Sequence, residues 1–355
     1  MELIWVPHPP RLDHPDRWVL EAEADLTGAM LEEVVGDRDM VTPVPQLWAD
    51  GSRPHYLEIR HLAATSGGDV LGLGSMELPI ADNQHSAVIW ANVAAGSRRR
   101  GIGTALFEAL EATAAREGRS TLLVWADERP PGSGDRLRGT EAGEIDAGSA
   151  SARFLSGRGY ELKLVERISR AEVAPPDRRA ADLAEARLRV GSQYELVSWV
   201  GATPEPWLDQ MAALRVSMST DAPSGGVDFG AERWDAERVR ADDAALRMGD
   251  REQITTAARH RSSGDAAGFT RMFVDLSVRS VAHQWETLVT AAHRGHGLGA
   301  LLKAHNHQLL AETFPEVQRL ITGNATQNRW MLAINDHLGY RPYSLEGLYE
   351  RQTTG

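Results

Sequence analysis

Two patterns of hydrophobic residues alternate along the chain, and together they predict an α/β protein. Segments in which apolar and polar residues alternate, or in which short apolar runs occur, are typical of β-strands. Segments in which apolar residues recur every three or four positions are typical of amphipathic helices. Strands are predicted at residues 56–62, 70–78, 85–93, 121–126, 161–169, 194–200, 253–259, 269–276, 283–290, 319–322 and 343–351. Helices are predicted at residues 18–35, 149–158, 177–190, 204–218, 231–248 and 327–338, and two more begin near residues 102 and 298.

Two segments do not follow either pattern. Residues 1–16 are rich in proline and histidine, and we expect a leading arm there. Residues 127–148 contain a Pro-Pro-Gly-Ser-Gly run and many charges, and they are too long and polar for an ordinary connection. They form either a loop that covers a substrate or a disordered insert, and their composition favours a mobile insert.

A glycine-rich turn between a strand and a helix occurs twice, at residues 98–103 (RRRGIG) and at residues 294–299 (RGHGLG). The first turn of a helix has backbone N–H groups without internal partners, and the helix dipole adds partial positive charge there. Glycine lets an anion approach the backbone without a Cβ in the way. We therefore expect both turns to bind an anionic group, and the arginines strengthen that expectation.

The repeat of this unit, at positions 98 and 294, indicates a duplicated domain rather than a solenoid. We predict an N-terminal domain over residues 1–172 and a C-terminal domain over residues 193–355. The linker over residues 173–192 has two prolines at positions 175 and 176 and continues as an Ala/Arg-rich helical segment.

Composition narrows the class of protein. A chain of 355 residues with 42% hydrophobic residues is long enough for two ordinary globular domains. The net charge of −12 argues against a sequence-independent nucleic-acid binder. The sequence has no apolar run of membrane-spanning length, no secretory signal pattern and no cysteine. We therefore expect a cytoplasmic protein that binds neither nucleic acid nor membrane, as a monomer or homodimer.

The two turns resemble the acetyl-coenzyme A loop of the GCN5-related N-acetyltransferases, the GNAT family. The family motif is Gln or Arg, two residues, Gly, one residue, and Gly or Ala, and both copies match it. Each copy is followed by a strand and a short helix that ends in Gly-Tyr. The resemblance covers most of both halves and is closest to tandem actinobacterial acetyltransferases, including the mycothiol synthase group, over residues 282–340. The residues that carry this closest part are Asn324, Asn328, Met331, Asn335 and Gly339.

Other glycine motifs fit less well. A Walker A loop needs Gly-Lys-Ser/Thr after its second glycine, and neither copy has it. Residues 295–300 satisfy a dinucleotide pattern, but the next strand ends without the acidic residue expected there.

The resemblance implies two tandem domains, each with a mixed, largely antiparallel sheet, a central splayed pair of parallel strands and flanking helices. It also implies acetyl-coenzyme A as cofactor, with its pantetheine against a strand edge and its pyrophosphate at the glycine turn. The residues assigned to cofactor binding are Leu288, Val289, Arg294, Gly295, His296, Gly297, Leu298, Gly299, Asn324 and Asn328 in the second half, and Arg98, Arg99, Arg100, Gly101, Ile102 and Gly103 in the first.

Direct acyl transfer to an amine needs a proton acceptor, donors for the thioester carbonyl and a donor for the leaving thiolate. Glu286 is the candidate base, although a salt-bridged strand glutamate fits its position equally well, and His283 is a second candidate. Asn335 stands where many family members have the tyrosine that protonates the thiolate, and Leu155 stands there in the first half. The first half also lacks an acidic residue on the matching strand. We therefore predict that the C-terminal domain is catalytic, while the N-terminal domain binds the cofactor weakly or is structural.

The sequence thus predicts an acetyl-CoA-dependent N-acetyltransferase acting on a small-molecule amine. Because both halves lack the usual tyrosine, a non-catalytic acyl-coenzyme A sensor or scaffold is an alternative. A peptide or protein N-acetyltransferase is a further alternative, since nothing in the sequence identifies the acceptor.

Overall fold

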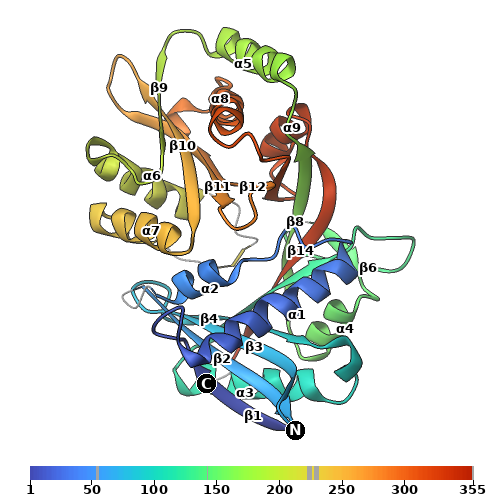
Figure 1. Ribbon diagram of the computed structural model, residues 1–355. Coiled ribbons are helices and arrows are strands. Elements are labelled where there is room, and N and C mark those ends of the chain that lie inside the picture. Colours follow the sequence, from blue (N-terminus) through green and yellow to red (C-terminus); the bar gives the residue numbers. More distant parts are fainter. Residues whose placement is uncertain (53–55, 142, 222–225, 228–231, 354–355) are drawn as a thin grey trace. The chain divides into compact units, whose positions relative to one another are not determined.

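The computed structural model describes residues 1–355 apart from 53–55, 142, 222–225, 228–231 and 354–355 (Figure 1). The chain divides into two compact units, each assembled from more than one segment. Unit 1 comprises Met1–Glu166, Ser224–Gly230 and Ser344–Gly355, and unit 2 comprises Arg167–Pro223 and Ala231–Tyr343. Within the described ranges, no helix combines the length and the apolar character needed to cross a membrane.

The sheet of unit 1 contains five consecutive strands followed by a strand from the C-terminus. Its order is β1 (Glu2–Pro7), β2 (Leu57–Ser66), β3 (Asp69–Pro79), β4 (Ser86–Val93), β5 (Thr121–Glu128) and the end of β14 (Arg341–Gln352). β4 and β5 are parallel, and the other pairs are antiparallel. The helices are α1 (Trp18–Val34), α2 (Val44–Gly51), α3 (Ile102–Arg116) and α4 (Ala150–Gly157), and β8 (Glu161–Glu172) begins in this unit.

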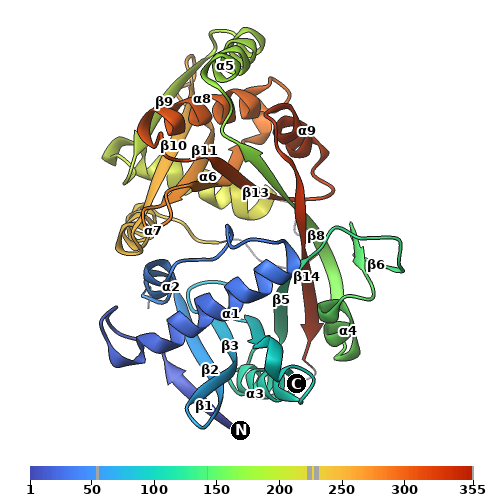
Figure 2. The same cartoon turned by 45° about the vertical axis from the view of Figure 1, so that its right-hand side comes forward.

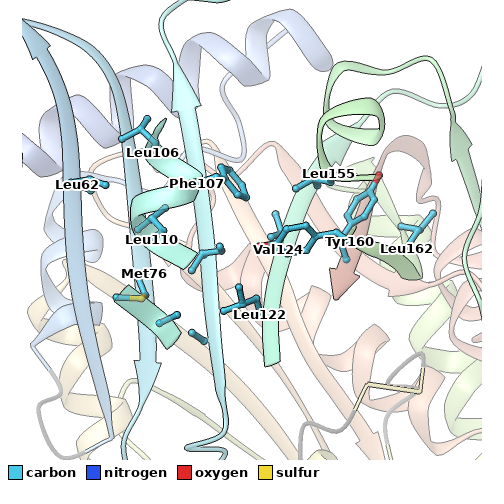
Figure 3. Close-up of a cluster of buried hydrophobic side chains, with 14 of the residues drawn as sticks. Leu62, Met76, Leu106, Phe107, Leu110, Leu122, Val124, Leu155, Tyr160 and Leu162 are labelled. Carbon is cyan, nitrogen blue, oxygen red and sulfur yellow. The ribbon is translucent and has the colours of Figure 1, made fainter. Parts of the chain in front are cut away.

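Helices α1 and α3 cover opposite faces of this sheet (Figures 1 and 2). Successive residues of a strand point to opposite faces, so one strand contacts both helices. On β2, Leu62 packs in the cluster that contains α3, whereas Ala63 packs in the cluster that contains α1. Figure 3 shows the α3 side, where Leu106, Phe107 and Leu110 meet the strands. Gly74 allows α3 to lie close to β3, since a Cβ at that position would come within 2.9 Å of Leu110 Cδ1.

Unit 2 repeats the same plan. Its sheet order is β9 (Tyr194–Val200), β10 (Arg251–His260), β11 (Ala266–Asp275), β12 (Val281–Val289), β13 (Arg319–Ala325) and the end of β8. β12 and β13 are the parallel pair. The helices are α5 (Pro176–Val190), α6 (Leu208–Asp221), α7 (Ala236–Met248), α8 (Leu298–Thr313) and α9 (Arg329–His337). The predicted α/β class with a central parallel pair in each half is confirmed.

The helices of unit 2 also divide between two faces of the sheet. On one face, α6 and α7 pack around Trp199, Phe269 and Leu288. On the other, α8 packs on Met272 and Ala282, and α5 packs beside the beginning of α8 (Figure 1). Residues near the unit 2 parallel pair can therefore lie on an α6/α7 side or an α8 side.

Three expectations from the sequence differ from this fold. Residues 1–16 are not only a leading arm, because β1 pairs along β2 from Glu2 to Pro7. The segment 127–148 is not a disordered insert over its described part. Its strands β6 (Arg136–Arg138) and β7 (Glu144–Asp146) pair with each other, and Ile145 is fully buried in the unit 1 core.

The third difference concerns the predicted boundaries at residues 172 and 193. The last strand does not stay with its own half, because β14 pairs with β5 of unit 1 from Leu345 to Gln352. Conversely, β8 ends in unit 2, where Ala171 joins the core. The expected linker contains α5, whose Ala186 and Val190 pack on α8. A hydrophobic strand at a sheet end is stabilised by whichever neighbour offers an edge, and sequence pattern does not specify which.

Candidate functional site

In each unit the two parallel strands pair over a short stretch and then separate. Within the described residues, β12 and β13 pair only where residues 281–283 face residues 319–321, although β12 continues to Val289 and β13 to Ala325. β4 and β5 pair in the same way, where residues 86–88 face residues 121–123. We call the separated ends of these strands the splay of each unit. Unpaired strand edges offer backbone N–H and C=O groups to an extended ligand.

The glycine turn follows the first splayed strand in both units. Gly101 and Gly297 are the N-cap residues of α3 and α8, with φ values of 81° and 79°. Such left-handed conformations favour glycine. The first helical bonds run from the N–H of Ala105 to Gly101 and from the N–H of Leu301 to Gly297. The preceding N–H groups lie ahead of the helical ladder and are suited to an anion.

The first arginine of each turn fixes the turn to the strand before it. Arg98 Nε donates to the carbonyl oxygen of Val93, and Arg294 Nε donates to that of Val289, both at 3.0 Å. Because each guanidinium is directed back at its strand, we assign these two arginines to shaping the turn.

The exposed side chains of the two turns differ in charge. Arg99 has a φ of 62° where unit 2 has Gly295, whose φ is 84°. Arg100 of unit 1 corresponds to His296 of unit 2, and both side chains are exposed. A non-glycine residue in the left-handed region costs on the order of 1 kcal/mol. The unit 1 turn therefore carries more positive charge than the unit 2 turn, with some backbone strain.

A β-bulge beside the splay distinguishes unit 2 from unit 1. The β11–β12 register shifts between Thr270 and Met272, whereas the β3–β4 register has no shift over residues 72–77. Gln284, which is 2% exposed, donates from Nε2 to the Arg271 carbonyl oxygen at 2.9 Å and thereby fixes the bulge. A bulge leaves a backbone group outside the ladder, where it can face a ligand.

Glu286, the candidate base, lies beside the bulge in a network of buried ion pairs. Its Oε2 is 3.0 Å from Arg271 Nη2, and its Oε1 is 3.7 Å from Arg215 Nη1. The same two arginines each contact Asp242 Oδ2 at 2.9 Å. Burial lowers the pKa of Arg215, but the charges of Glu286 and Asp242 outweigh burial and raise it. This geometry matches the salt-bridged alternative that the sequence left open for Glu286.

The second candidate base, His283, occupies the last paired position of β12, next to Ile321. Its Nε2 is 3.8 Å from Asp275 Oδ2, and Asp275 is also bound by Arg251. His283 therefore lies beside the Arg251–Asp275 ion pair.

On the α8 side of unit 2, three polar side chains form a hydrogen-bonded chain that ends at the splay. Lys303 Nζ of α8 donates to Asn335 Oδ1 of α9 at 2.6 Å. Asn335 Nδ2 donates to Asn324 Oδ1 of β13, also at 2.6 Å. Lys303 and Asn335 are 1% and 0% exposed, whereas Asn324 is half-buried. We call these residues the Lys303 chain.

The surroundings of Lys303 are apolar or neutral. Burial lowers the pKa of Lys303 to about 7. Its Nζ lies 4.0 Å from Met331 Sδ and 5.5 Å from the Tyr340 ring centre. His307 hydrogen-bonds Tyr340, and burial followed by the charge of Lys303 lowers the pKa of His307 to about 3. Among the residues that the structure describes, no carboxylate forms an ion pair with Lys303.

Unit 1 has apolar residues at the corresponding positions. Alignment of the glycine turns and of the parallel strand pairs places Phe107 at Lys303 and Ala126 at Asn324. Leu155 of α4 stands at Asn335. Phe107 and Leu155 are 4% and 2% exposed and belong to the unit 1 core, where Phe107 contacts Phe154 with ring centres 5.0 Å apart (Figure 3). Unit 1 therefore packs hydrophobically where unit 2 has its polar chain.

The remaining predicted cofactor residues of unit 2 have structural contacts. Asn328 Oδ1 accepts from the N–H of Met331 at 3.2 Å and so caps α9. Leu288 is buried among α6 and α7, and Val289 packs against the α5–α8 cluster. Each of these contacts positions backbone next to the splay.

A cavity of about 340 Å³ lies next to the end of β12 in unit 2. Thr290, which follows β12 directly, lines it together with Gln210, Ala213, Leu214, Ser217, Gly264, Asp265 and Ala266. Its volume is in the range of small-molecule sites.

Sequence reasoning missed Lys303 and the arginines 215 and 271. The signal for Lys303 is its position: residues 299, 303 and 307 follow one buried stripe of α8, and the first half has phenylalanine at the same place. The arginines lie on α6 and β11, far from any motif, so only the fold brings them to Glu286.

Comparisons with known proteins agree with this geometry. Residues 29–131 match the model of the acetyltransferase (GNAT) family. A tandem GNAT protein from the clavulanic acid biosynthesis pathway is 25% identical, with a TM-score of 0.74 over 100% of this chain and 99% of that one. A GCN5-related N-acetyltransferase from Sphaerobacter thermophilus shares the fold at 14% identity and a TM-score of 0.61, over 99% and 95% of the two chains. No curated protein matches the sequence.

Proposed function

We propose that this chain transfers an acetyl group from acetyl-coenzyme A to the amine of a small molecule, with the chemistry in unit 2. The match of residues 29–131 to the GNAT acetyltransferase family and the similarity of the whole fold to a tandem GNAT protein support this proposal. The observation that carries this assignment is the contrast between the two splays. The unit 2 splay has a bulge and a buried polar chain, whereas the unit 1 splay has regular pairing and an apolar core.

In this proposal the turn at residues 294–299 holds the pyrophosphate through the N–H groups that precede the helical ladder of α8. The unpaired edge of β12 near Leu288 and Val289 holds the pantetheine by backbone hydrogen bonds. The N–H released by the bulge stabilises negative charge on the thioester carbonyl. The unit 1 turn, with its three arginines, binds a second coenzyme molecule or serves only as structure.

The amine must be neutral when it attacks. Glu286 is held by two arginines, and its protonation would leave them one counter-charge short, so we assign it an electrostatic rather than a basic role. The amine proton then passes to water. His283, engaged near Asp275, is assigned no proton transfer.

A small-molecule acceptor is favoured over a protein for two reasons. The cavity beside Thr290 has the volume of a small-molecule site. The relative that spans the whole chain comes from a pathway that makes a small molecule. A cytoplasmic location fits the supply of acetyl-coenzyme A.

The test is thiol release from acetyl-coenzyme A with a panel of small amines and peptides, using matched variants of the two turns. His296→Glu and Arg100→Glu each place one negative charge at the same position of its turn. We expect His296→Glu to abolish most amine-dependent release, while Arg100→Glu keeps the larger part. Release that survives His296→Glu and disappears with Arg100→Glu would assign the chemistry to unit 1. Coenzyme binding without release, for any acceptor, would support the sensor alternative.

A further inference from the structure

The Lys303 chain has a direction that its chemistry fixes. A lysine amine at this site acts as a donor, so the atom of Asn335 that faces Lys303 Nζ at 2.6 Å is the carbonyl Oδ1. Asn335 must then present its NH2 group to Asn324, whose Oδ1 accepts it at 2.6 Å. The two amides are thereby oriented in series, each donating toward β13.

The last group of the Lys303 chain is a hydrogen-bond donor, the Nδ2 of Asn324. Because Asn324 Oδ1 is occupied, Asn324 Nδ2 remains, and among the described residues the structure gives it no hydrogen-bond partner. Asn324 is half-buried and lies three residues beyond Ile321, the last residue of β13 that pairs with β12. Its amide therefore stands at the splay, where a thioester would lie if unit 2 binds the coenzyme.

A contribution to folding stability does not explain why a lysine is buried at position 303. Burying an ammonium group without a carboxylate is costly, and Phe107 fills the same place in unit 1 with a hydrophobic contact. All three members of the Lys303 chain differ between the units: unit 1 has Phe107, Leu155 and Ala126 in their places. This joint replacement is what one expects of residues that act as one device, present in one unit and absent from the other.

We propose, on the basis of the function proposed above, that Lys303 is a positioning residue, which acts through Asn335 to direct the Asn324 amide at the sulfur of the thioester and so stabilises the leaving thiolate by hydrogen bonding. The amine nitrogen adds to the carbonyl carbon; the C–S bond then breaks as the C=O bond re-forms, and the sulfur takes the electron pair of the C–S bond. The amine proton goes to water, and coenzyme A leaves as the thiolate. No protein group needs to protonate the sulfur, which accounts for an amide side chain, Asn335, at the position where many family members have tyrosine.

Hydrogen bonds in series strengthen one another, and a cation at the head of the chain polarises both amides. Burial lowers the pKa of Lys303 to about 7, so the cation is lost as the pH rises through neutrality. The groups that face it, Tyr340 and Met331, are uncharged, and His307 is neutral because its own pKa is lowered to about 3. Thiolate stabilisation should therefore weaken above neutral pH in wild type.

The test measures amine-dependent thiol release from acetyl-coenzyme A by the full chain at pH 6 and at pH 8.5, on either side of the Lys303 pKa of about 7. Arg100→Glu is used as the background so that the readout comes from unit 2. At pH 6, Lys303→Met should lower kcat about tenfold while the KM for acetyl-coenzyme A changes less than about threefold. At pH 8.5, where Lys303 is already neutral, Lys303→Met should have nearly the kcat of the background. Asn324→Ala should lower kcat at both pH values, and at pH 6 the double variant should lose no more than Asn324→Ala alone.

Asn306→Leu is the control. Asn306 is a fully buried polar residue of α8, and its hydrogen bonds to Ile254 and Thr256 are not part of the Lys303 chain. This variant should leave kcat at pH 6 nearly unchanged even if unit 2 becomes less stable. An unchanged kcat at pH 6 in both Lys303→Met and Asn324→Ala would overturn the proposal, and so would an equal, pH-dependent fall in Asn306→Leu. If the Arg100→Glu background binds no coenzyme A at all, the proposed function of unit 2 fails instead. If Lys303→Met does not fold, the half-buried Asn324→Ala decides the question alone.

Discussion

Replacing Glu286 with glutamine tests whether this residue holds unit 2 together. The carboxylate lies 3.0 Å from Arg271 Nη2 and 3.7 Å from Arg215 Nη1, and both guanidinium groups are at least 95% buried. At an effective dielectric constant of about 20, these two pairs correspond to about 5.5 and 4.5 kcal/mol. Removing the carboxylate from water costs several kcal/mol, so the net loss in Glu286→Gln should be about 3–5 kcal/mol.

Urea unfolding of the full chain measures this loss. With a slope of about 2 kcal/mol per molar urea, the midpoint of the unit 2 transition should fall by roughly 1.5–2.5 M. Glu205→Gln is the matched control, because Glu205 pairs with Arg240 at 2.5 Å while the two side chains are 78% and 52% exposed. An exposed pair contributes less than about 1 kcal/mol. A midpoint shift in Glu286→Gln no larger than that in Glu205→Gln would refute the account of Glu286 as a buried counter-ion.

Two further predictions concern unit 1. Burial and the neighbouring Asp127 carboxylate raise the pKa of Glu346, so the folded state retains a proton that the unfolded state releases. The free energy of unfolding should therefore fall as the pH rises from about 5 to 8. Urea unfolding at both pH values should show that this fall is about 2 kcal/mol smaller in Glu346→Gln than in wild type. A difference between the two proteins that is the same at both pH values would contradict this. Ser149 Oγ accepts from the Ala152 N–H at 3.0 Å and donates to Glu128 Oε1 at 2.9 Å, so Ser149→Ala should cost about 1–2 kcal/mol. Ser149→Thr, which keeps both bonds, should lose less, and equal losses would argue against the cap.

The glycine turns were predictable from sequence because their chemistry is local. A strand, two glycines at fixed spacing and an apolar helix face specify the positive φ of Gly101 and Gly297 without any tertiary information. The alternation of residues 56–62, which predicts β2, was visible for the same reason. The β11–β12 bulge was not, because a register shift depends on the partner strand.

The errors share a physical cause, which is that tertiary contacts decided the outcome. Prolines and histidines in residues 1–16 favour an arm, yet residues 2–7 form β1 because they pair with the edge of β2. The described part of residues 127–148 is ordered by burial of Ile145, a contact that composition does not reveal. Lys303 is an ionisable residue on a helix face that pattern would assign to the core, and the fold places Asn335 where it accepts a hydrogen bond from Lys303.

The most direct test of the central claim, that the unit 2 turn is the coenzyme site that supports transfer, is native mass spectrometry with acetyl-coenzyme A. A negative charge about 6 Å from a phosphate, at an effective dielectric constant of about 40, weakens binding by about 1.4 kcal/mol, or roughly tenfold. We expect His296→Glu to lose one bound coenzyme that wild type and Arg100→Glu both retain at the same acetyl-coenzyme A concentration. Equal occupancy in wild type and His296→Glu, or loss of all coenzyme in Arg100→Glu alone, would contradict the account.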